Sequence, residues 1–211
     1  MNLNRKRLNE FKLYAITDIK REDSEVLNQI KEALRGGVDI IQLRSKDVSD
    51  HFLLEVGKKI RQMTRQLNKL FMVNDRVDLM MALDADGVHL GQDDLPIKMA
   101  RAIIKNKSKF IGRSTHSLQQ AQQAAKEGAD YIGYGPIFET PTKPTYPPIG
   151  LDSIQKVVQK IKIPVVCIGG IDQSNMKTVV RAGANRIAVV RAIFSSAHPF
   201  HAARELKRMI S

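Results

Sequence analysis

The stretch Gly37-Val38-Asp39-Ile40-Ile41 follows a segment with helical periodicity and begins an apolar run, so it marks the end of a helix and the start of a strand. The same order of a small residue, an Asp or Asn, and an apolar run returns at 85–88, 128–132 and 183–187. A glycine at this point is typical of a left-handed helix C-cap. The stretch is therefore one copy of a repeated helix–strand junction.

Four further apolar runs lie between these junctions, at 12–17, 70–73, 110–113 and 164–168. Eight strands that alternate with helical segments indicate a parallel sheet with right-handed crossovers. Eight such units in 211 residues predict the α/β class and a minimal, single-domain (β/α)8 TIM barrel. The predicted barrel covers residues 11–211, after an N-terminal extension over 1–10. An open, doubly wound sheet is the structural alternative.

The composition places the chain among ordinary globular proteins, with 43% hydrophobic and 27% charged residues. It contains no apolar run of about 18 or more residues, so no transmembrane helix is expected. The first ten residues are polar and basic, unlike a secretory signal. The single cysteine, Cys167, lies within an apolar run and fits a reducing compartment. We therefore expect a cytoplasmic protein with no internal disulfide.

The formal net charge is +12, which is compatible with nucleic acid, an acidic membrane surface or small anions as partners. The basic residues are scattered over helical faces, and there is neither tryptophan nor aromatic interleaving. Most of them are therefore interpreted as solvated helix faces. We expect small phosphorylated molecules as partners and neither nucleic acid nor membrane. The oligomeric state stays open, with a homo-oligomer as one outcome.

Carboxylates follow two successive strands of the predicted barrel. Asp75 comes after the run at 70–73, and Asp93 and Asp94 come after 87–90. In this barrel class the chemistry occurs at the C-terminal ends of the strands, so these side chains are expected on one rim. Carboxylates are hard oxygen ligands, and a few of them can hold Mg²⁺ together with water and substrate phosphate.

Cations gather at the end of the strand that follows Asp39. Strand alternation places Gln42, Arg44 and Lys46 on one face of the chain. An arginine inside a barrel mouth is rare unless an anion pairs with it. Arg44 is therefore predicted to bind an anionic ligand, and a structural Arg–Asp pair is the alternative.

Two further segments offer groups for phosphate. The loop over 133–150 is rich in Pro, Thr and Gly, and a loop of this length in a small barrel is usually functional. Within it, Thr140, Thr142 and Lys143 supply hydroxyls and an ammonium group. Glycines 169–170 and the end of the last strand at 190–191 occupy the usual phosphate site of these barrels.

Two helix caps, the last helix and two histidines can also be interpreted from the residues alone. Ser117 is predicted to cap a helix, with Gln120 completing a capping box, and Ser174 is predicted to cap the next-to-last helix. The last helix is expected over 199–209. His89 is interpreted as a core residue with satisfied hydrogen bonds, and His116 as the histidine better placed for chemistry.

Taken together, the motifs resemble those of the thiamine phosphate synthase family, from about residue 14 to the last helix. The matching segments are Gln42-Leu43-Arg44-x-Lys46-Asp47, Asn74-Asp75, Gly87-Val88-His89-Leu90-Gly91-Gln92-x-Asp94, Tyr131-Ile132-Gly133-x-Gly135-Pro136-Ile137-Phe138, Thr140-x-Thr142-Lys143 and Ile168-Gly169-Gly170-Ile171. The resemblance implies that 4-amino-5-hydroxymethyl-2-methylpyrimidine diphosphate condenses with thiazole phosphate to give thiamine monophosphate and diphosphate. It also implies a Mg²⁺-assisted dissociative substitution without a protein nucleophile, which rests on positioning and electrostatic stabilisation.

The resemblance assigns roles by position. One Mg²⁺ per subunit would be held by Asp75 and by Asp94 rather than Asp93. The catalytic group would consist of Arg44, Lys46, Ser114 and Lys143, which contact the pyrimidine diphosphate. The substrate-binding group would add Gln42 and Asn74 at the pyrimidine, Thr140 and Thr142 at the thiazole phosphate, and backbone groups at Gly170, Val190 and Arg191. Many family members have serine where this chain has Arg191, so the role of that side chain stays open.

Three alternative functions compete with this interpretation. The segments 111–114, 116–117 and 193–197 resemble thiazole tautomerase, a relative of the same fold, with His116 as its acid–base residue. A non-catalytic phosphate-ligand-binding barrel and a basic nucleic-acid binder are the others. None of the three requires the full set of two carboxylates and three cations, which favours the synthase.

Overall fold

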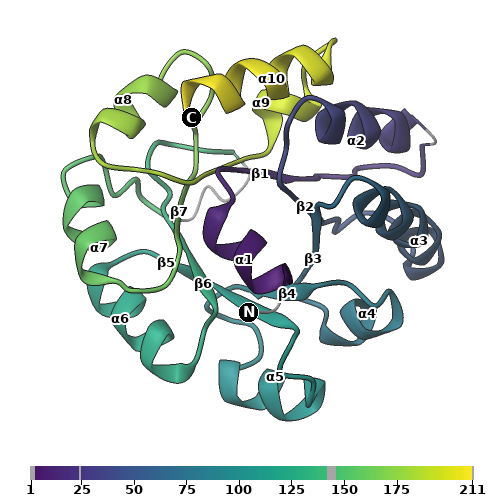
Figure 1. Cartoon of the computed structure of the whole chain (residues 1–211), viewed down its shortest axis with the longest axis horizontal. Helices are drawn as coiled ribbons and strands as arrows, with labels where there is room; N and C mark the ends of the chain where they lie inside the picture. Colours follow the sequence, from purple (N-terminus) through teal and green to yellow (C-terminus); the bar gives the residue numbers. More distant parts are fainter. Residues whose placement is uncertain (1–2, 24, 142–145, 211) are drawn as a thin grey trace.

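Eight parallel strands close into a barrel in the computed structural model, in sequence order from β1 to β8 (Figure 1). The structure describes residues 3–23, 25–141 and 146–210. β8 pairs with β1, where Leu13 lies opposite Ile187. This closing pair excludes the open doubly wound sheet, and the (β/α)8 prediction is confirmed. The strands are β1 (Leu13–Ile16), β2 (Ile40–Leu43), β3 (Leu70–Asn74), β4 (Gly87–Leu90), β5 (Phe110–Thr115), β6 (Tyr131–Tyr134), β7 (Val165–Ile168) and β8 (Ile187–Val189).

Helices form a ring around the outside of the barrel (Figure 1). Among the described residues, no helix has the length and apolar character needed to cross a bilayer. The predicted last helix over 199–209 is confirmed as α10. The helices of the ring are α2 (Glu25–Arg35), α3 (Asp50–Gln66), α4 (Val77–Ala82), α5 (Ile97–Ile104), α6 (Leu118–Glu127), α7 (Ile154–Lys160), α8 (Met176–Arg181), α9 (Arg191–Phe194) and α10 (Pro199–Met209).

The helix caps confirm one local prediction and correct another. Ser117 caps α6, because its hydroxyl accepts the backbone N–H of Gln120 at 3.2 Å. The same helix ends at Gly128 in the left-handed conformation, with φ of 96°. The prediction for Ser174 is wrong: Asn175 precedes α8, and the Ser174 hydroxyl donates to Asp172 instead. The carboxylate two residues earlier is the stronger acceptor for that hydroxyl.

The core has two layers, which follow from the alternation of side chains along each strand. Residues such as Ala15 and Ile41 point outward and pack with the apolar faces of the helices. The alternate residues point inward and fill the barrel. This inner layer consists of Leu8, Phe11, Tyr14, Ile16, Ile40, Leu70, Met72, Phe110, Tyr131, Val166 and Ala188. As far as the described residues show, the barrel interior is therefore a packed core.

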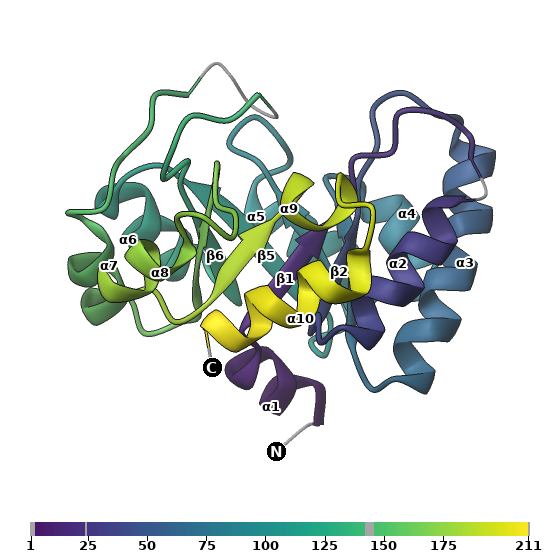
Figure 2. The ribbon, with the colours of Figure 1, turned by 90° about the horizontal axis from the view of Figure 1, so that it is seen from above.

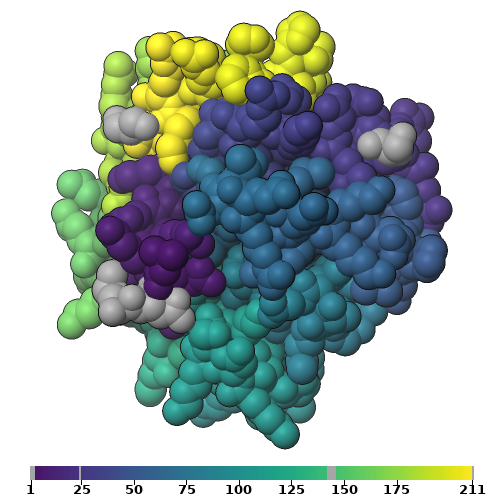
Figure 3. All heavy atoms as spheres, turned by 45° about the vertical axis from the view of Figure 1, so that its right-hand side comes forward, coloured from purple at the N-terminus to yellow at the C-terminus, as the bar shows by residue number. Residues whose placement is uncertain are grey.

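The segment expected as an extension contains a helix, α1 (Leu3–Glu10), which covers the barrel end where the strands begin (Figure 2). Leu8 and Phe11 are buried there and join the inner core layer. The outer side of α1 forms part of the molecular surface, in dark purple beside the yellow C-terminal segment (Figure 3). The sequence of α1 has little amphipathic periodicity, so the pattern of apolar residues did not predict this helix. α1 closes the barrel end opposite to the one on which the strand-end side chains gather.

The repeated aspartates of the helix–strand junctions join neighbouring strands at this closed end. The carboxylate of Asp39 accepts the backbone N–H of Leu13 at 3.1 Å. Asp86 accepts that of Phe71 and Asp130 that of Ile111, both at 2.8 Å. Each bond joins an even-numbered strand to the preceding odd-numbered one, so the sequence repeat has a structural cause.

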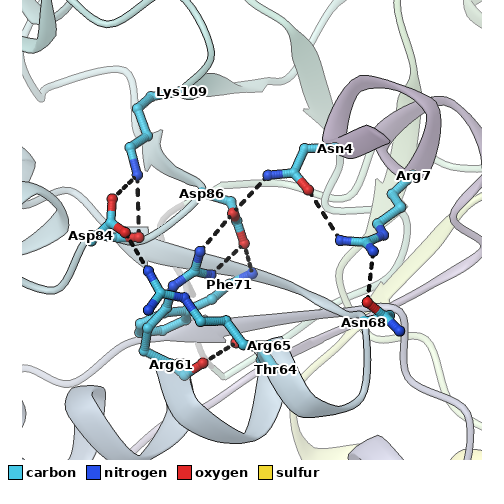
Figure 4. A network of polar contacts seen from close by, with 10 residues as sticks. All are labelled: Asn4, Arg7, Arg61, Thr64, Arg65, Asn68, Phe71, Asp84, Asp86 and Lys109. Carbon is cyan, nitrogen blue, oxygen red and sulfur yellow. Dashed lines mark hydrogen bonds and ion pairs between the residues drawn. The ribbon is translucent and has the colours of Figure 1, made fainter. Parts of the chain in front are cut away.

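Side chains from helices bind two of these carboxylates, Asp86 and Asp130, and Figure 4 shows the contacts of Asp86. Arg61 of α3 binds Asp86 through both terminal nitrogens, at 2.8 and 3.1 Å. Asn4 of α1 donates to the same carboxylate at 3.1 Å. Arg5, also of α1, pairs with Asp130 at 2.6 Å. The aspartates therefore hold strands, outer helices and α1 together in one network.

Replacing Asp86 with alanine is expected to lower the free energy of unfolding by about 3 kcal/mol, because the Arg61 charge would remain buried without its partner. Asp86 is 4% exposed and Arg61 15% exposed. Asp84 is a matched control, since it also pairs with cations in Figure 4 but is 59% exposed. Because Asp84 has a left-handed conformation, with φ of 46°, the control variant is Asp84→Asn, which tolerates that conformation and is expected to cost less than about 1 kcal/mol. Urea unfolding of both variants measures the difference, and equal costs would contradict the assignment.

Candidate active site

A cavity of about 340 Å³ opens at the C-terminal ends of the strands, above the packed barrel interior. Parallel strands bring their C-terminal ends to one rim, so residues far apart in sequence line the same space. Of the predicted site residues, the structure brings these to the cavity wall: Gln42, Arg44, Asn74, Ser114, Thr140, Gly170, Val190 and Arg191.

Three of the predicted site residues that the structure describes are not part of this wall. Lys46 is exposed on the rim beyond β2, and Asp75 and Asp94 lie outside the cavity lining. Thr142 and Lys143 fall outside the described residues. The described wall of the cavity therefore combines side chains at the ends of β2, β3 and β5 with the glycines after β7.

The two carboxylates predicted to bind a metal follow neighbouring strands. β3 pairs with β4, and the backbone N–H of Asp75 donates to the carbonyl of His89 at 2.8 Å. Asp75 has a φ of 59°, a left-handed conformation that aspartate tolerates better than most residues. Asp94 lies in the turn after β4, where one of its oxygens accepts the N–H of Gly91. Asp93, by contrast, is exposed.

This donor set suits a cation that takes most of its ligands from elsewhere. Two half-buried carboxylates on adjacent strand ends offer hard oxygen atoms. Within residues 3–23, 25–141 and 146–210, no group of three or more His, Cys, Asp or Glu side chains could enclose a metal. A fully protein-coordinated zinc or calcium site is therefore not formed by these residues, whereas Mg²⁺ with water and phosphate ligands fits them.

Arg44 forms the structural Arg–Asp pair that was its alternative role, and it also lines the cavity where an anion would bind. The guanidinium pairs with the carboxylate of Asp18, which confirms that an Arg–Asp pair exists. Arg44 is also 8% exposed and part of the cavity wall. The hydroxyl of Thr17 accepts the N–H of Arg44 at 2.8 Å and so fixes its backbone to the end of β1. The arginine is thus preorganised at the cavity with its charge partly compensated.

The opposite side of the cavity is formed by backbone. Gly169 and Gly170, after β7, have φ values of 100° and 65°, which favour glycine. A Cβ on Gly170 would lie 2.6 Å from the carbonyl oxygen of Glu139. The amide of Asn175 donates to the Gly170 carbonyl at 2.8 Å and fixes the orientation of that peptide. Together with Val190 and Arg191, these groups form a close-fitting, largely main-chain surface.

Asp172 adds a negative charge next to this surface. The hydrogen bond from the Ser174 hydroxyl is the main cause that lowers the pKa of Asp172, and the nearby positive charge of Arg191 acts in the same direction. Asp172 lines the cavity and was missed from the sequence, because nothing before the fold relates it to Arg191. The two opposite charges therefore lie at the same, glycine-rich end of the cavity.

Both histidines of interest line the cavity. The ring nitrogens of His89 bond to the hydroxyls of Tyr131 and Ser114, each at 3.0 Å, which confirms that its hydrogen bonds are satisfied. The ring of His116 bonds to the carbonyl of Gly135 and stacks on Tyr146, with centroids 4.0 Å apart. Tyr146 was missed because its long loop shows no periodicity, although an aromatic ring in a loop of Pro, Thr and Gly is a signal in itself.

Comparisons with known proteins agree with this geometry. A family model described as thiamine monophosphate synthase matches residues 13–193. A thiamine-phosphate synthase of Pyrococcus furiosus is 44% identical over 202 residues, which cover 96% of each chain. One of Chloroflexus aurantiacus is 44% identical over 204 residues, 96% of this chain and 94% of the other.

A solved structure extends the similarity to three dimensions. The thiamine phosphate pyrophosphorylase from Pyrococcus furiosus superposes with a TM-score of 0.87 at 40% identity, over 98% of this chain and 97% of that one. The family match and the two relatives each extend over most of the chain. The chain belongs to the thiamine monophosphate synthase family and is a transferase of thiamine biosynthesis.

Proposed function

We propose that the protein joins 4-amino-5-hydroxymethyl-2-methylpyrimidine diphosphate to thiazole phosphate, giving thiamine monophosphate and diphosphate. The observation that carries this proposal is that one cavity has two chemically distinct ends. Amide and hydroxyl side chains on β2, β3 and β5 form one end, and the glycines after β7 with the backbone after β8 form the other. A planar, hydrogen-bonding ring suits the first end and a phosphate the second.

At the first end, Gln42 and Asn74 bind the aminopyrimidine and Ser114 contacts the pyrimidine diphosphate. Gln42 is 2% exposed, so its amide is desolvated and its hydrogen bonds discriminate strongly between ligands. At the second end, the backbone at Gly170, Val190 and Arg191 binds the thiazole phosphate, with Thr140 on the same wall. Thr142 would add to it, outside the described residues.

The diphosphate would lie toward the acidic pair and the cations. Asp75 and Asp94 would hold one Mg²⁺, which when bound neutralises charge on the leaving diphosphate. Arg44 and Lys46 supply positive charge from β2 and the rim beyond it, and Lys143 would do so from the long loop. Preorganised charges of this kind stabilise a developing anion without reorganisation during the reaction.

The reaction is a dissociative substitution. The bond between the pyrimidine methylene carbon and the diphosphate oxygen breaks, and the electron pair leaves with diphosphate. The resulting pyrimidine cation forms a new carbon–nitrogen bond with the thiazole nitrogen. The protein supplies positioning, exclusion of water and charge, and no side chain becomes covalently bound.

The decisive experiment incubates the purified protein with both phosphorylated substrates and Mg²⁺ and follows the products by mass spectrometry. Thiamine monophosphate and diphosphate are expected in equal amounts. Their absence, with both substrates intact, would refute the proposal. Conversion of the thiazole substrate alone would favour the tautomerase alternative. His116, the acid–base residue of that alternative, lies in the cavity wall. A salt series in a nucleic-acid filter-binding assay tests the basic-binder alternative.

Replacing Gly170 with alanine is expected to weaken the binding of thiazole phosphate about tenfold. A Cβ on Gly170 would lie 2.6 Å from the carbonyl oxygen of Glu139, so the peptide proposed to bind the phosphate must shift; a loss of about 1.4 kcal/mol in binding corresponds to this factor. Gly128→Ala is the matched control, since its φ is 96° but nothing lies within 4 Å of the added carbon. Calorimetric titration of both variants should show the loss in Gly170→Ala alone, and equal losses would refute the phosphate assignment.

A further inference from the structure

A continuous chain of hydrogen bonds crosses the barrel beneath the cavity and joins five strands. Gln42 of β2 donates from Nε2 to the hydroxyl of Tyr14 on β1 at 2.6 Å. That hydroxyl meets the Tyr131 hydroxyl on β6 at 3.0 Å. Tyr131 meets Nδ1 of His89 on β4, and Nε2 of His89 meets the Ser114 hydroxyl on β5, both at 3.0 Å. The two ends of the chain, Gln42 and Ser114, line the cavity.

Burial keeps both tyrosines protonated, so each can take part in the chain as a neutral donor. Tyr14 is 2% exposed and Tyr131 is fully buried. Burial is the main cause that raises the pKa of each phenol above its usual value. Each hydroxyl therefore has one hydrogen to donate and an oxygen with which to accept.

The donor at Gln42 sets the direction of every following bond. The Tyr14 oxygen accepts from the Gln42 amide, and the remaining partner that the described residues offer its hydrogen is Tyr131. Tyr131 then donates to Nδ1 of His89. His89 carries its hydrogen on Nε2 and donates it to the Ser114 oxygen. The opposite order would leave a buried hydroxyl hydrogen without an acceptor, which proteins avoid.

We propose that Tyr14, Tyr131 and His89 are positioning residues that fix the hydrogen-bonding pattern of the cavity through this chain. With its nitrogen held by Tyr14, Gln42 presents its oxygen to the ligand as an acceptor. With its oxygen occupied by His89, Ser114 presents its hydrogen as a donor. This inference rests on the proposed function and deepens it, because it explains how the site distinguishes the aminopyrimidine ring from similar rings.

The pattern selects an aminopyrimidine against a pyrimidinone. An exocyclic amino group donates to the Gln42 oxygen, whereas the oxo group of a pyrimidinone would meet it oxygen to oxygen. A glutamine whose amide could rotate would accept either ring by presenting its nitrogen or its oxygen. The chain removes that freedom, and Tyr14 is the residue that holds the amide.

The first test concerns the free protein and does not depend on the reaction. Nitrogen-15 NMR of histidine-labelled protein reports which ring nitrogen of His89 carries the hydrogen, with His89→Gln identifying its signals among the five histidines. The chain requires hydrogen on Nε2 and none on Nδ1. A predominant Nδ1–H form of His89 would overturn the inference whatever the protein catalyses.

The second test measures discrimination by calorimetric titration with the aminopyrimidine diphosphate and its 4-oxo analogue. The wild-type protein is expected to prefer the amino compound by about 100-fold or more. Tyr14→Phe should reduce this preference to about tenfold or less, while circular dichroism shows a folded barrel. The ratio of the two affinities is informative, because a general loss of stability would weaken the binding of both compounds equally.

Tyr134→Phe provides the matched control. Tyr134 is also a buried tyrosine, 2% exposed, but its hydroxyl bonds to Ser153 at 2.8 Å and takes no part in the chain. This variant should keep the wild-type preference. An unchanged preference in Tyr14→Phe, or an equal loss in Tyr134→Phe, would refute the positioning role. If the wild-type protein bound neither compound, the proposed function would fail, and the histidine NMR would decide the hydrogen-bond order alone.

Discussion

Asp94→Asn is expected to lower kcat by about a thousandfold while the protein stays folded. The substitution removes one of the two carboxylates proposed to hold Mg²⁺, and with it the charge that stabilises the leaving diphosphate. Asparagine keeps an oxygen that can accept the Gly91 N–H, so the turn after β4 should be preserved. Steady-state turnover, measured over a range of Mg²⁺ concentrations, should also show a higher Mg²⁺ requirement.

Asp93→Asn is the matched control for this experiment. Asp93 is adjacent in the same turn but exposed, and the same charge is lost without loss of a metal ligand. Its turnover should stay within about threefold of the wild type, since one exposed charge contributes little. Near wild-type turnover in Asp94→Asn, or equal losses in both variants, would contradict the metal assignment.

Arg44→Ala is expected to reduce kcat/KM by about 100- to 1000-fold. It removes a buried cation from the cavity wall and leaves the negative charge of Asp18 close to the proposed diphosphate. Hydrogen bonds from a buried charged group are among the strongest that a site can offer. Steady-state kinetics with the pyrimidine diphosphate varied should show the loss.

Asp18→Asn separates the two roles of Arg44. If the arginine mainly served a structural pair, removal of either partner would impair the enzyme to the same degree. If it binds diphosphate, Asp18→Asn leaves the guanidinium in place, and kcat/KM should stay within about threefold of the wild type. Thermal unfolding of Arg44→Ala and Asp18→Asn measures how much the Arg44–Asp18 pair stabilises the fold. Equal kinetic losses would refute the ligand-binding role.

The strand positions could be predicted because each strand carries its own local signal. The run at 87–90 coincides with β4, and the run at 70–73 falls one residue short of β3. Buried parallel strands are continuous apolar runs, and a capping glycine or an aspartate precedes several of them. The helix α1 gave no such signal, since it is polar around most of its circumference and is stabilised by contacts with the barrel end.

The site was predictable where function depends on the position of a residue along its strand. Gln42 and Arg44 could be placed at the cavity because side chains alternate along β2. The partners of these residues were not predictable. Nothing in the sequence relates Tyr14 to Tyr131, since their bond spans 117 positions of the chain. Only closure of the barrel makes such inner residues neighbours.

The placement of α1 has a practical consequence for attaching the protein to other molecules. Figure 2 shows that both ends of the described chain lie on the side of α1, away from the loops that surround the cavity. A linker at either end would leave the cavity pointing away from whatever the protein is tethered to. Immobilised on a surface through either terminus, the barrel should therefore keep full access to substrates in the surrounding solution.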